Sequence, residues 1–264
     1  MIMKLFSLIR IALTAVVVGA ALLVNQTSFS AAVIEGERMH PVEAKNGMVV
    51  TSHFLATQSA LAVLEQGGNA VDAAVTAAFS LAVTQPRSGN IGGGGFMLIS
   101  SEKKDEVVAI DYREKAPSQA TVDMFLDEKG DADSNLSRFS HLAAGVPGTV
   151  AGLALALEKY GTITLQQAMA PAIELAEDGF IVTPRFSNGL KQREDRLKKW
   201  DSSKKVFYKA DGSYYEPGDR FVQKDLAETL KRISTHGVEE FYQGKTAQLL
   251  VEEMKRHGGL ISLD

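Results

Sequence analysis

The sequence predicts a folded protein of mixed helix and strand, of the α/β (α+β) class. Two helix patterns, at 54–66 and 70–84, precede two short strand patterns, at 96–100 and 107–112. Hydrophobic residues make up 45% of the 264 residues, which is enough for a core and more than a disordered chain carries. The 23 glycines and the 7% of aromatic residues also fit an alanine- and glycine-rich protein of this class.

Local signals set the bounds of the first two helices. Thr51 or Ser52 is the expected N-cap of the first helix, and a pair of glycines ends it. Asn69 and Asp72 have the spacing of a capping box at the start of the second helix, which ends before Pro86. Because the second helix is apolar on almost every face, we expect it to be buried.

The rest of the chain continues with the same kinds of element. A polar turn joins the two strands into a hairpin, and 127–139 is expected to be a surface loop. Acidic residues in that loop imitate the start of a calcium loop, but leucines stand at the required glycine and glutamate positions. A small hairpin is expected around Asp211-Gly212, and the charged segment 191–205 is expected to form a solvated helical face. Four further helices are predicted, at 148–160, 165–177, 225–235 and 246–257.

The first 32 residues have the pattern of a signal peptide. Lys4 and Arg10 precede an apolar run at 11–24, and small residues then allow a cut after Ser30 or Ala32. The prediction is export, so that the mature protein is periplasmic or secreted. The alternative is a membrane anchor, because the uncharged run is long enough to span a bilayer if it is not cleaved.

Charge and residue content exclude several classes of function. With 28 Lys+Arg against 32 Asp+Glu, the formal net charge of −4 does not suggest the basic footprint that nucleic-acid binding needs, and we expect no nucleic-acid partner. Cysteine is absent, which excludes disulfides, thiolate nucleophiles and iron–sulfur clusters. The five histidines are scattered and form no H-E-x-x-H pair, so we expect no metal site and no cofactor.

Two features have the chemistry of a small-molecule site. The glycine run in 90–95 lacks the lysine of a phosphate loop and precedes a strand, so its expected role is close backbone approach with unusual φ angles beside a site. Arg113 follows the second strand, and its planar guanidinium suits a carboxylate. The alternative for Arg113 is an ion pair with Asp111 or Glu114. No G-x-S-x-G elbow is present.

Five motifs together resemble one enzyme family. In order and spacing they are similar to the start of the large subunit of gamma-glutamyltranspeptidases, and the resemblance extends from about Pro41 to Asp264. The motifs are KNGMV (45–49), GGNAVDAA (67–74), GNIGGGGFM (89–97), DYREKAP (111–117) and GVPGTVAG (145–152).

The resemblance implies an N-terminal-nucleophile hydrolase with an αββα sandwich, present only in part, with 33–264 as the N-terminal portion of the large subunit. Members of this family are proenzymes that cut themselves into a large and a small subunit. The nucleophile is the threonine freed at the start of the small subunit, which is expected beyond Asp264. We therefore assign no catalytic residue within the chain, and Thr149 in its glycine-rich setting is not taken as one. The family arginine that clamps the donor α-carboxylate is here Arg113.

The implied reaction moves a γ-glutamyl group from glutathione or another γ-glutamyl compound, through a γ-glutamyl-enzyme, to water or to an amino acid or peptide. The implied partners are these donors and acceptors, together with the missing small subunit. Alternatives are a related acylase, a capsule-polyglutamate transferase, or a non-catalytic exported binding protein. By itself the chain is expected to be catalytically silent and marginally folded, with helix 70–84 incompletely covered.

Overall fold

The computed structural model describes residues 34–35, 38–39 and 43–264, and its contacts divide the chain into two units, 1–47 and 48–264. In the first unit, β1 (Ile34–Glu35) pairs antiparallel with β2 (Arg38–Met39). The predicted signal peptide at 1–32 lies outside the described residues. Among the helices that are described, none combines the length and the apolar character needed to cross a membrane.

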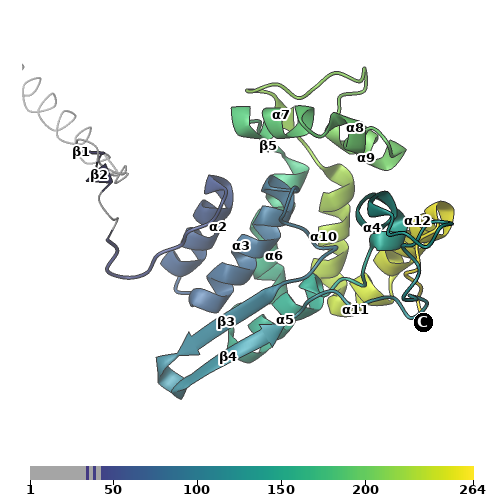
Figure 1. Ribbon diagram of the computed structural model, residues 1–264. Coiled ribbons are helices and arrows are strands. Elements are labelled where there is room, and N and C mark those ends of the chain that lie inside the picture. The colour runs from purple at the N-terminus through teal and green to yellow at the C-terminus, as the bar shows by residue number, and fades with distance from the viewer. Residues whose placement is uncertain (1–33, 36–37, 40–42) are drawn as a thin grey trace, which may run out of the picture. The chain divides into compact units, whose positions relative to one another are not determined.

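The second unit combines helices with one long β-hairpin (Figure 1). Strands β3 (Phe96–Ser101) and β4 (Glu106–Asp111) pair antiparallel along their whole length, and β5 (Phe180–Ile181) pairs with β6 (Arg220–Phe221). Two short 3-10 turns, η1 (Glu102–Lys104) and η2 (His141–Ala143), join longer elements. The helices are α2 (Phe54–Glu65), α3 (Ala70–Thr84), α4 (Ser134–Phe139), α5 (Thr149–Tyr160), α6 (Leu165–Glu177), α7 (Pro184–Lys191), α8 (Glu194–Leu197), α9 (Asp201–Phe207), α10 (Lys224–His236), α11 (Val238–Tyr242) and α12 (Lys245–His257).

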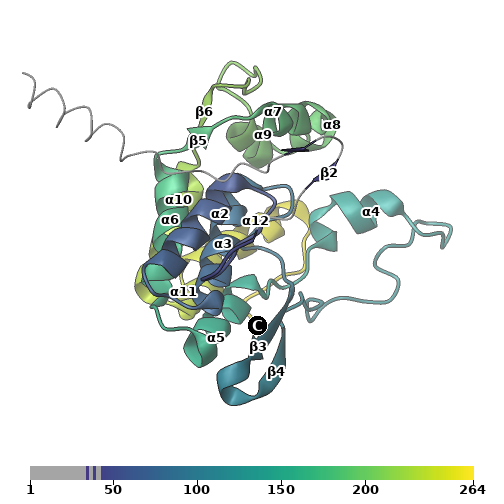
Figure 2. The ribbon, with the colours of Figure 1, turned by 90° about the vertical axis from the view of Figure 1, so that its left-hand side faces the viewer.

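Helix α3 lies at the centre of this unit. It packs against α2, α5 and α6, and α6 in turn packs against α10 (Figures 1 and 2). Val75, Phe79 and Val83 have no exposed surface. The prediction that this helix is buried is confirmed, whereas the expectation that it would be incompletely covered is wrong. Helices α2, α5 and α6 of the same chain cover α3.

The hairpin buries one face and exposes the other. Ile99 and Ile110 point into the core, as alternation along paired strands requires. On the opposite face the side chains of Phe96, Leu98 and Val107 are between 65% and 77% exposed. Helices therefore cover one side of a two-stranded layer, which is part of a layered α+β architecture, and an apolar face stays open.

Several local predictions differ from the structure. The N-cap of α2 is His53, whose Nδ1 accepts the N–H of Leu55 at 3.3 Å, rather than Thr51 or Ser52. The loop predicted at 127–139 ends in the short helix α4, and 191–205 is divided between the end of α7 and the two short helices α8 and α9. Around Gly212 there is a turn, closed by the N–H of Lys209 on the carbonyl of Ser213, without flanking strands.

The capping box at the start of α3 is confirmed and has a second function. Asn69 Oδ1 accepts the N–H groups of Val71 and Asp72, while Asp72 Oδ2 accepts the N–H of Asn69 at 2.8 Å. The fully buried Asp72 carboxylate also accepts the N–H of Thr162 at 2.8 Å and its hydroxyl at 2.6 Å. One carboxylate thus joins α3 to the turn between α5 and α6.

Replacing Asp72 with alanine is expected to lower the free energy of unfolding by about 3 kcal/mol at neutral pH, because the N–H groups of Asn69, Thr162 and Ile163 lose their charged acceptor. Burial by itself raises the pKa of Asp72, but the hydrogen bonds from Thr162, Asn69 and Ile163 outweigh it and hold the pKa below its usual value. Because the pKa of Asp72 is lowered, its ionised carboxylate stabilises the folded state fully above about pH 4. This stabilisation is lost as the pH falls through the folded-state pKa.

Urea unfolding of wild type and Asp72→Asn at neutral and acidic pH checks the pH dependence, and the exposed Asp195→Asn is the matched control. The stability difference between wild type and Asp72→Asn should shrink on acidification. A difference that is the same at pH 7 and pH 3 would show that the ionised carboxylate does not stabilise the fold.

Candidate functional site

Arg113 stands on a turn that immediately follows the hairpin. Its N–H donates to Asp111 Oδ1 at 3.0 Å, and Tyr112 is still paired with Gly95 through two backbone hydrogen bonds of 3.0 and 3.3 Å. Beyond it, Lys115 exchanges two backbone hydrogen bonds with Val146. Arg113 is therefore held by backbone contacts on both sides.

The glycine run packs directly behind this turn. A Cβ on Gly94 would lie 2.4 Å from the carbonyl oxygen of Tyr112, and one on Gly95 would lie 2.9 Å from the Tyr112 ring. At Gly92, in contrast, nothing lies within 4 Å of such a Cβ. The expected close approach is confirmed at particular positions, but the expectation of unusual φ angles is wrong, since no residue of 92–95 has a positive φ. Gly94 and Gly95 are therefore needed for space and not for backbone conformation.

The start of α5 completes the same cluster. The carbonyl of Gly93 accepts the N–H groups of Gly148 and Thr149 at 2.7 and 3.0 Å, and so satisfies two of the free donors at a helix start. A Cβ on Gly148 would meet the Tyr112 carbonyl at 2.1 Å, and one on Gly152 would meet the Tyr112 side chain at 2.3 Å. Three motifs that are far apart in the sequence (89–97, 111–117 and 145–152) therefore meet around Tyr112, whose pKa is raised by burial.

Tyr242 fixes this cluster from the opposite side, which the sequence analysis did not anticipate. Its hydroxyl donates to the carbonyl of Pro147 at 2.9 Å and accepts the N–H of Ala151 at 3.3 Å. The contact joins residues more than 90 positions apart, so no local pattern in the sequence indicates it.

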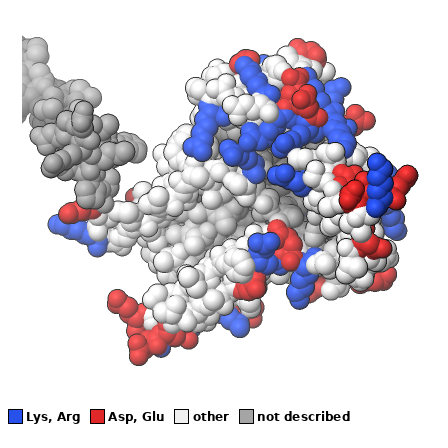
Figure 3. Space-filling model, in the orientation of Figure 1, with Lys and Arg blue, Asp and Glu red and all other residues white. Residues whose placement is uncertain are grey.

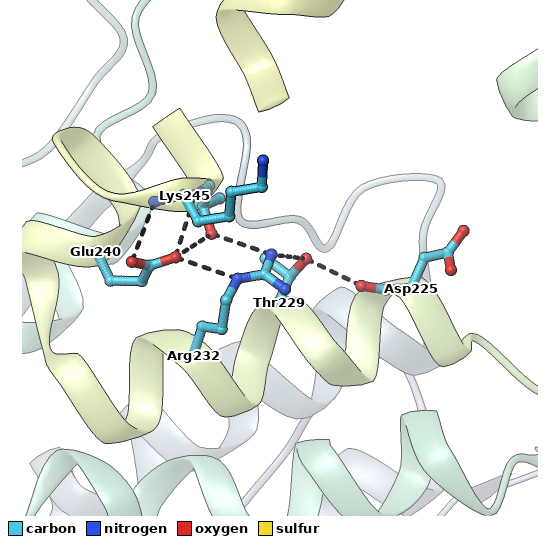
Figure 4. A network of polar contacts seen from close by, with 6 residues as sticks. Asp225, Thr229, Arg232, Glu240 and Lys245 are labelled. Carbon is cyan, nitrogen blue, oxygen red and sulfur yellow. Dashed lines mark hydrogen bonds and ion pairs between the residues drawn. The ribbon is translucent and has the colours of Figure 1, made fainter. Parts of the chain in front are cut away.

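A partly buried ion pair secures the short helix that carries Tyr242 (Figure 4). Arg232 Nε lies 3.1 Å from Glu240 Oε1, and the same carboxylate accepts the hydroxyl and N–H of Thr246 and the N–H of Lys245. Burial by itself raises the pKa of Glu240, yet these hydrogen bonds outweigh it and leave the pKa below its usual value. The ionised Glu240 therefore joins α10, α11 and α12.

The Arg113 side chain is largely exposed. Its Nε lies 3.1 Å from Glu114 Oε2, the side chain is 63% exposed, and the guanidinium carbon is 6.0 Å from the centre of the Phe96 ring. The predicted alternative of an ion pair is thus found with Glu114, while Asp111 accepts the backbone N–H instead. An ion pair as exposed as this one contributes at most about 1 kcal/mol, so a ligand carboxylate can displace Glu114.

Two cavities lie elsewhere, and Arg113 lines neither. One cavity has a volume of about 190 Å³ and is lined in part by Arg87, Arg185, Arg193 and His53. It lies close to the region α7–α9, where Lys and Arg residues gather at the top of Figure 3. Burial and then the Arg185 charge lower the pKa of His53, so the positive charge there comes from the arginines. The other, of about 480 Å³, lies between the start of α3 and the hairpin.

The turn at Arg113, the glycine run 92–95 behind it and the start of α5 are together called the Arg113 cluster. Its chemistry is that of an anion-binding site. Thr149, which the sequence analysis did not take as a nucleophile, is buried as the first residue of α5. Among the described residues that contact 111–115, there is no hydroxyl group hydrogen-bonded to a base. The cluster can therefore hold a carboxylate but does not by itself attack a substrate.

Comparison with known proteins places this arrangement in a family. The family model for gamma-glutamyltranspeptidase matches residues 56–264, which includes four of the five motifs. The chain belongs to the gamma-glutamyltranspeptidase family. The family resemblance predicted from the motifs is confirmed.

Individual relatives agree with this assignment. The chain is 47% identical over 256 residues to the glutathione hydrolase proenzyme of Escherichia coli (strain K12), covering 93% of this chain and 44% of that protein. It is 38% identical over 227 residues to the acylase ACY 1 proenzyme of Pseudomonas sp. (strain V22), covering 84% of this chain and 40% of that protein. The chain thus spans less than half the length of these two curated relatives.

The crystal structure of Helicobacter pylori gamma-glutamyltranspeptidase superposes with a TM-score of 0.82 at 50% identity, covering 84% of this chain and 64% of that one. The similarity of this chain to that structure confirms the predicted N-terminal-nucleophile hydrolase fold over the matched residues. In this chain, the elements that belong to the layered fold are the hairpin and the helices that cover one of its faces.

Proposed function

We propose that this chain supplies the substrate-carboxylate clamp of an enzyme that transfers γ-glutamyl groups from glutathione or a related donor to water, an amino acid or a peptide. The observation that carries the proposal is the convergence of three family motifs on one rigid turn that presents Arg113. Two parallel N–H donors of a guanidinium match the two oxygens of an α-carboxylate. A γ-glutamyl donor carries such a group at a fixed number of bonds from its scissile amide.

The clamp positions the donor for a nucleophile that we place outside this chain. We propose a threonine at the start of a small subunit, beyond Asp264, with its own α-amine as the base. Its hydroxyl oxygen would attack the γ-carbonyl carbon, the amide nitrogen would leave as an amine, and water or an acceptor amine would release the acyl group. Two facts support this placement: the relatives named above are proenzymes, and this chain covers less than half of each.

The open face of the hairpin is the surface that we propose for the missing small subunit. Phe96, Leu98 and Val107 form an apolar patch on two strands whose outer edges have no partner among the described residues. A second sheet packed on this face would bury those side chains, as in a four-layered sandwich. Arg113 lies at the end of the same hairpin, so a subunit that docks there would also cover the clamp.

The test is hydrolysis of a chromogenic γ-glutamyl anilide by the purified protein, produced as its gene encodes it. We expect turnover, a faster release of the aniline when an acceptor dipeptide is added, and none from residues 33–264 alone. An anilide of an unsubstituted acyl chain, which lacks the α-carboxylate, is the matched control substrate. Preferential cleavage of that control would instead favour the acylase activity for which the Pseudomonas relative is named.

We also propose that the protein is exported, with 1–32 removed as a signal peptide. Lys4 and Arg10 before the apolar run support it. N-terminal sequencing of protein from the periplasm or the medium should begin after Ser30 or Ala32. Recovery of the intact N-terminus from the membrane fraction would show an anchored protein instead.

A further inference from the structure

Two histidines and one glutamate meet at the C-terminal end of α12. Glu253 and His257 lie one turn apart on α12, and His141 comes from η2. Each of the three residues contributes one nitrogen or oxygen atom, and all of these atoms lie within 4.8 Å of one another. The five histidines looked scattered in the sequence, because this cluster forms only through the packing of η2 on α12.

The distances in this cluster are those of metal ligands more than of hydrogen bonds. His141 Nε2 lies 3.5 Å from Glu253 Oε1, and His257 Nε2 lies 3.6 Å from the same oxygen. Hydrogen bonds between nitrogen and oxygen are usually 2.7–3.2 Å long. Two ligands at the corners of a tetrahedron, each about 2.0–2.1 Å from a zinc ion, are about 3.3–3.4 Å apart.

The surroundings hold the three side chains in place. The two imidazole rings stack with their centres 4.6 Å apart, and Trp200 makes a T-shaped contact with each of them. The side chains of His141 and Glu253 are 15% and 27% exposed, and that of His257 is 35% exposed. Arg256 Nη1 contacts Glu253 Oε2 at 3.4 Å, and the Ser202 hydroxyl lies 3.4 Å from Oε1, the oxygen that faces the imidazoles.

We propose that His141, Glu253 and His257 bind a divalent transition metal of the zinc class, with solvent in the remaining coordination position. The donor set of two neutral imidazole nitrogens and one carboxylate oxygen is one that zinc accepts. The rival interpretation is an ion pair between Glu253 and a protonated histidine. Against it, the two separations of 3.5 and 3.6 Å between the imidazole nitrogens and Glu253 Oε1 are longer than the hydrogen bond that such a pair normally makes.

The site would have a structural function. It joins η2, which follows a long surface segment, to the last turn of α12, and Trp200 belongs to the connection between α8 and α9. A metal bound to folded protein but not to unfolded chain stabilises the fold by mass action. None of the three ligands belongs to the Arg113 cluster, so this proposal does not depend on the proposed γ-glutamyl chemistry.

The experiment is metal titration of the protein as its gene encodes it, after treatment with a chelator. Zinc sulfate should bind with a micromolar or lower Kd, and saturating zinc should raise the Tm by about 5 °C or more. Cobalt(II), the spectroscopic probe, should give the intense visible bands of a four- or five-coordinate site. Weak bands typical of six-coordinate cobalt, or a zinc Kd in the millimolar range, would refute the site.

Variants identify the ligands. His257→Ala, Glu253→Gln and His141→Asn should each weaken zinc binding at least tenfold and remove the cobalt bands. His236→Ala, an exposed histidine at the end of α10, is the matched control and should bind like wild type. Far-UV circular dichroism of the metal-free proteins checks that each variant folds. Binding that survives in His257→Ala and His141→Asn, or that is lost equally in His236→Ala, would assign the metal to another place.

Discussion

Replacing Arg113 with alanine is expected to raise the KM for a γ-glutamyl donor at least tenfold in the complete enzyme. Once the site is covered, the guanidinium and the donor α-carboxylate form a charge pair shielded from water, and removal of one member of such a pair costs about 2–5 kcal/mol. The present partner, Glu114, forms only an exposed ion pair and does not account for an effect of that size.

Steady-state kinetics with the γ-glutamyl anilide measure this effect. Arg113→Lys should recover little of the loss, because an ammonium group cannot make the paired contacts of a guanidinium. Arg138, which lies over Phe139 on α4, offers a matched control, and Arg138→Ala should leave the KM unchanged. If Arg113→Ala keeps the wild-type KM, Arg113 has a structural function and the clamp is elsewhere.

The second large effect is expected at Gly94. A side chain there would place its Cβ 2.4 Å from the Tyr112 carbonyl oxygen and 2.8 Å from the backbone nitrogen of Glu114. Both neighbours are backbone atoms held in the hairpin and its turn, so neither can move aside as a flexible side chain would. Gly94→Val should therefore leave little soluble or matured protein, and Gly94→Ala should already lose about 3 kcal/mol of stability.

Gly92 provides the control two residues away, because a Cβ at Gly92 meets nothing within 4 Å and its φ is not positive. Gly92→Ala should have the soluble yield and urea midpoint of wild type. The two alanine variants differ only in the neighbours that the new methyl group meets. Equal behaviour of the two variants would show that the turn after β4, which carries Arg113, does not pack against the glycine run in solution.

The sequence was sufficient where the relevant residues are close together. Asn69 with Asp72 predicts the start of α3, because both partners of the capping box lie within four residues. The buried character of α3 followed from its lack of a polar face. The exception was His53, whose ring nitrogen acts as a helix cap although histidine is rarely considered for this position.

Long-range contacts could not be predicted in this way. The glycine motif indicated that side chains are excluded, but only the fold shows that Gly94 is packed while Gly92 is open. The contact between Tyr242 and Pro147 and the meeting of His141 with His257 depend on how α11 and α12 pack, which no local pattern encodes. The place of Arg113 after the second strand singled it out, but left its function undecided between a carboxylate clamp and an ion pair, and the clamp followed from the family motif.

The carboxylate of Asp72 also has a consequence for synthesis of the chain. Its donor Thr162 lies 90 residues further on, so the ribosome takes roughly 5–18 s to add the residues between them. During that interval α3 can form as a helix, because its cap is local, but its buried charge has no long-range donor and α6 is not yet there to cover it. Final closure of this unit must therefore wait until the turn after α5 has left the ribosome. A nascent chain released before that point would present an uncovered apolar helix to chaperones and proteases.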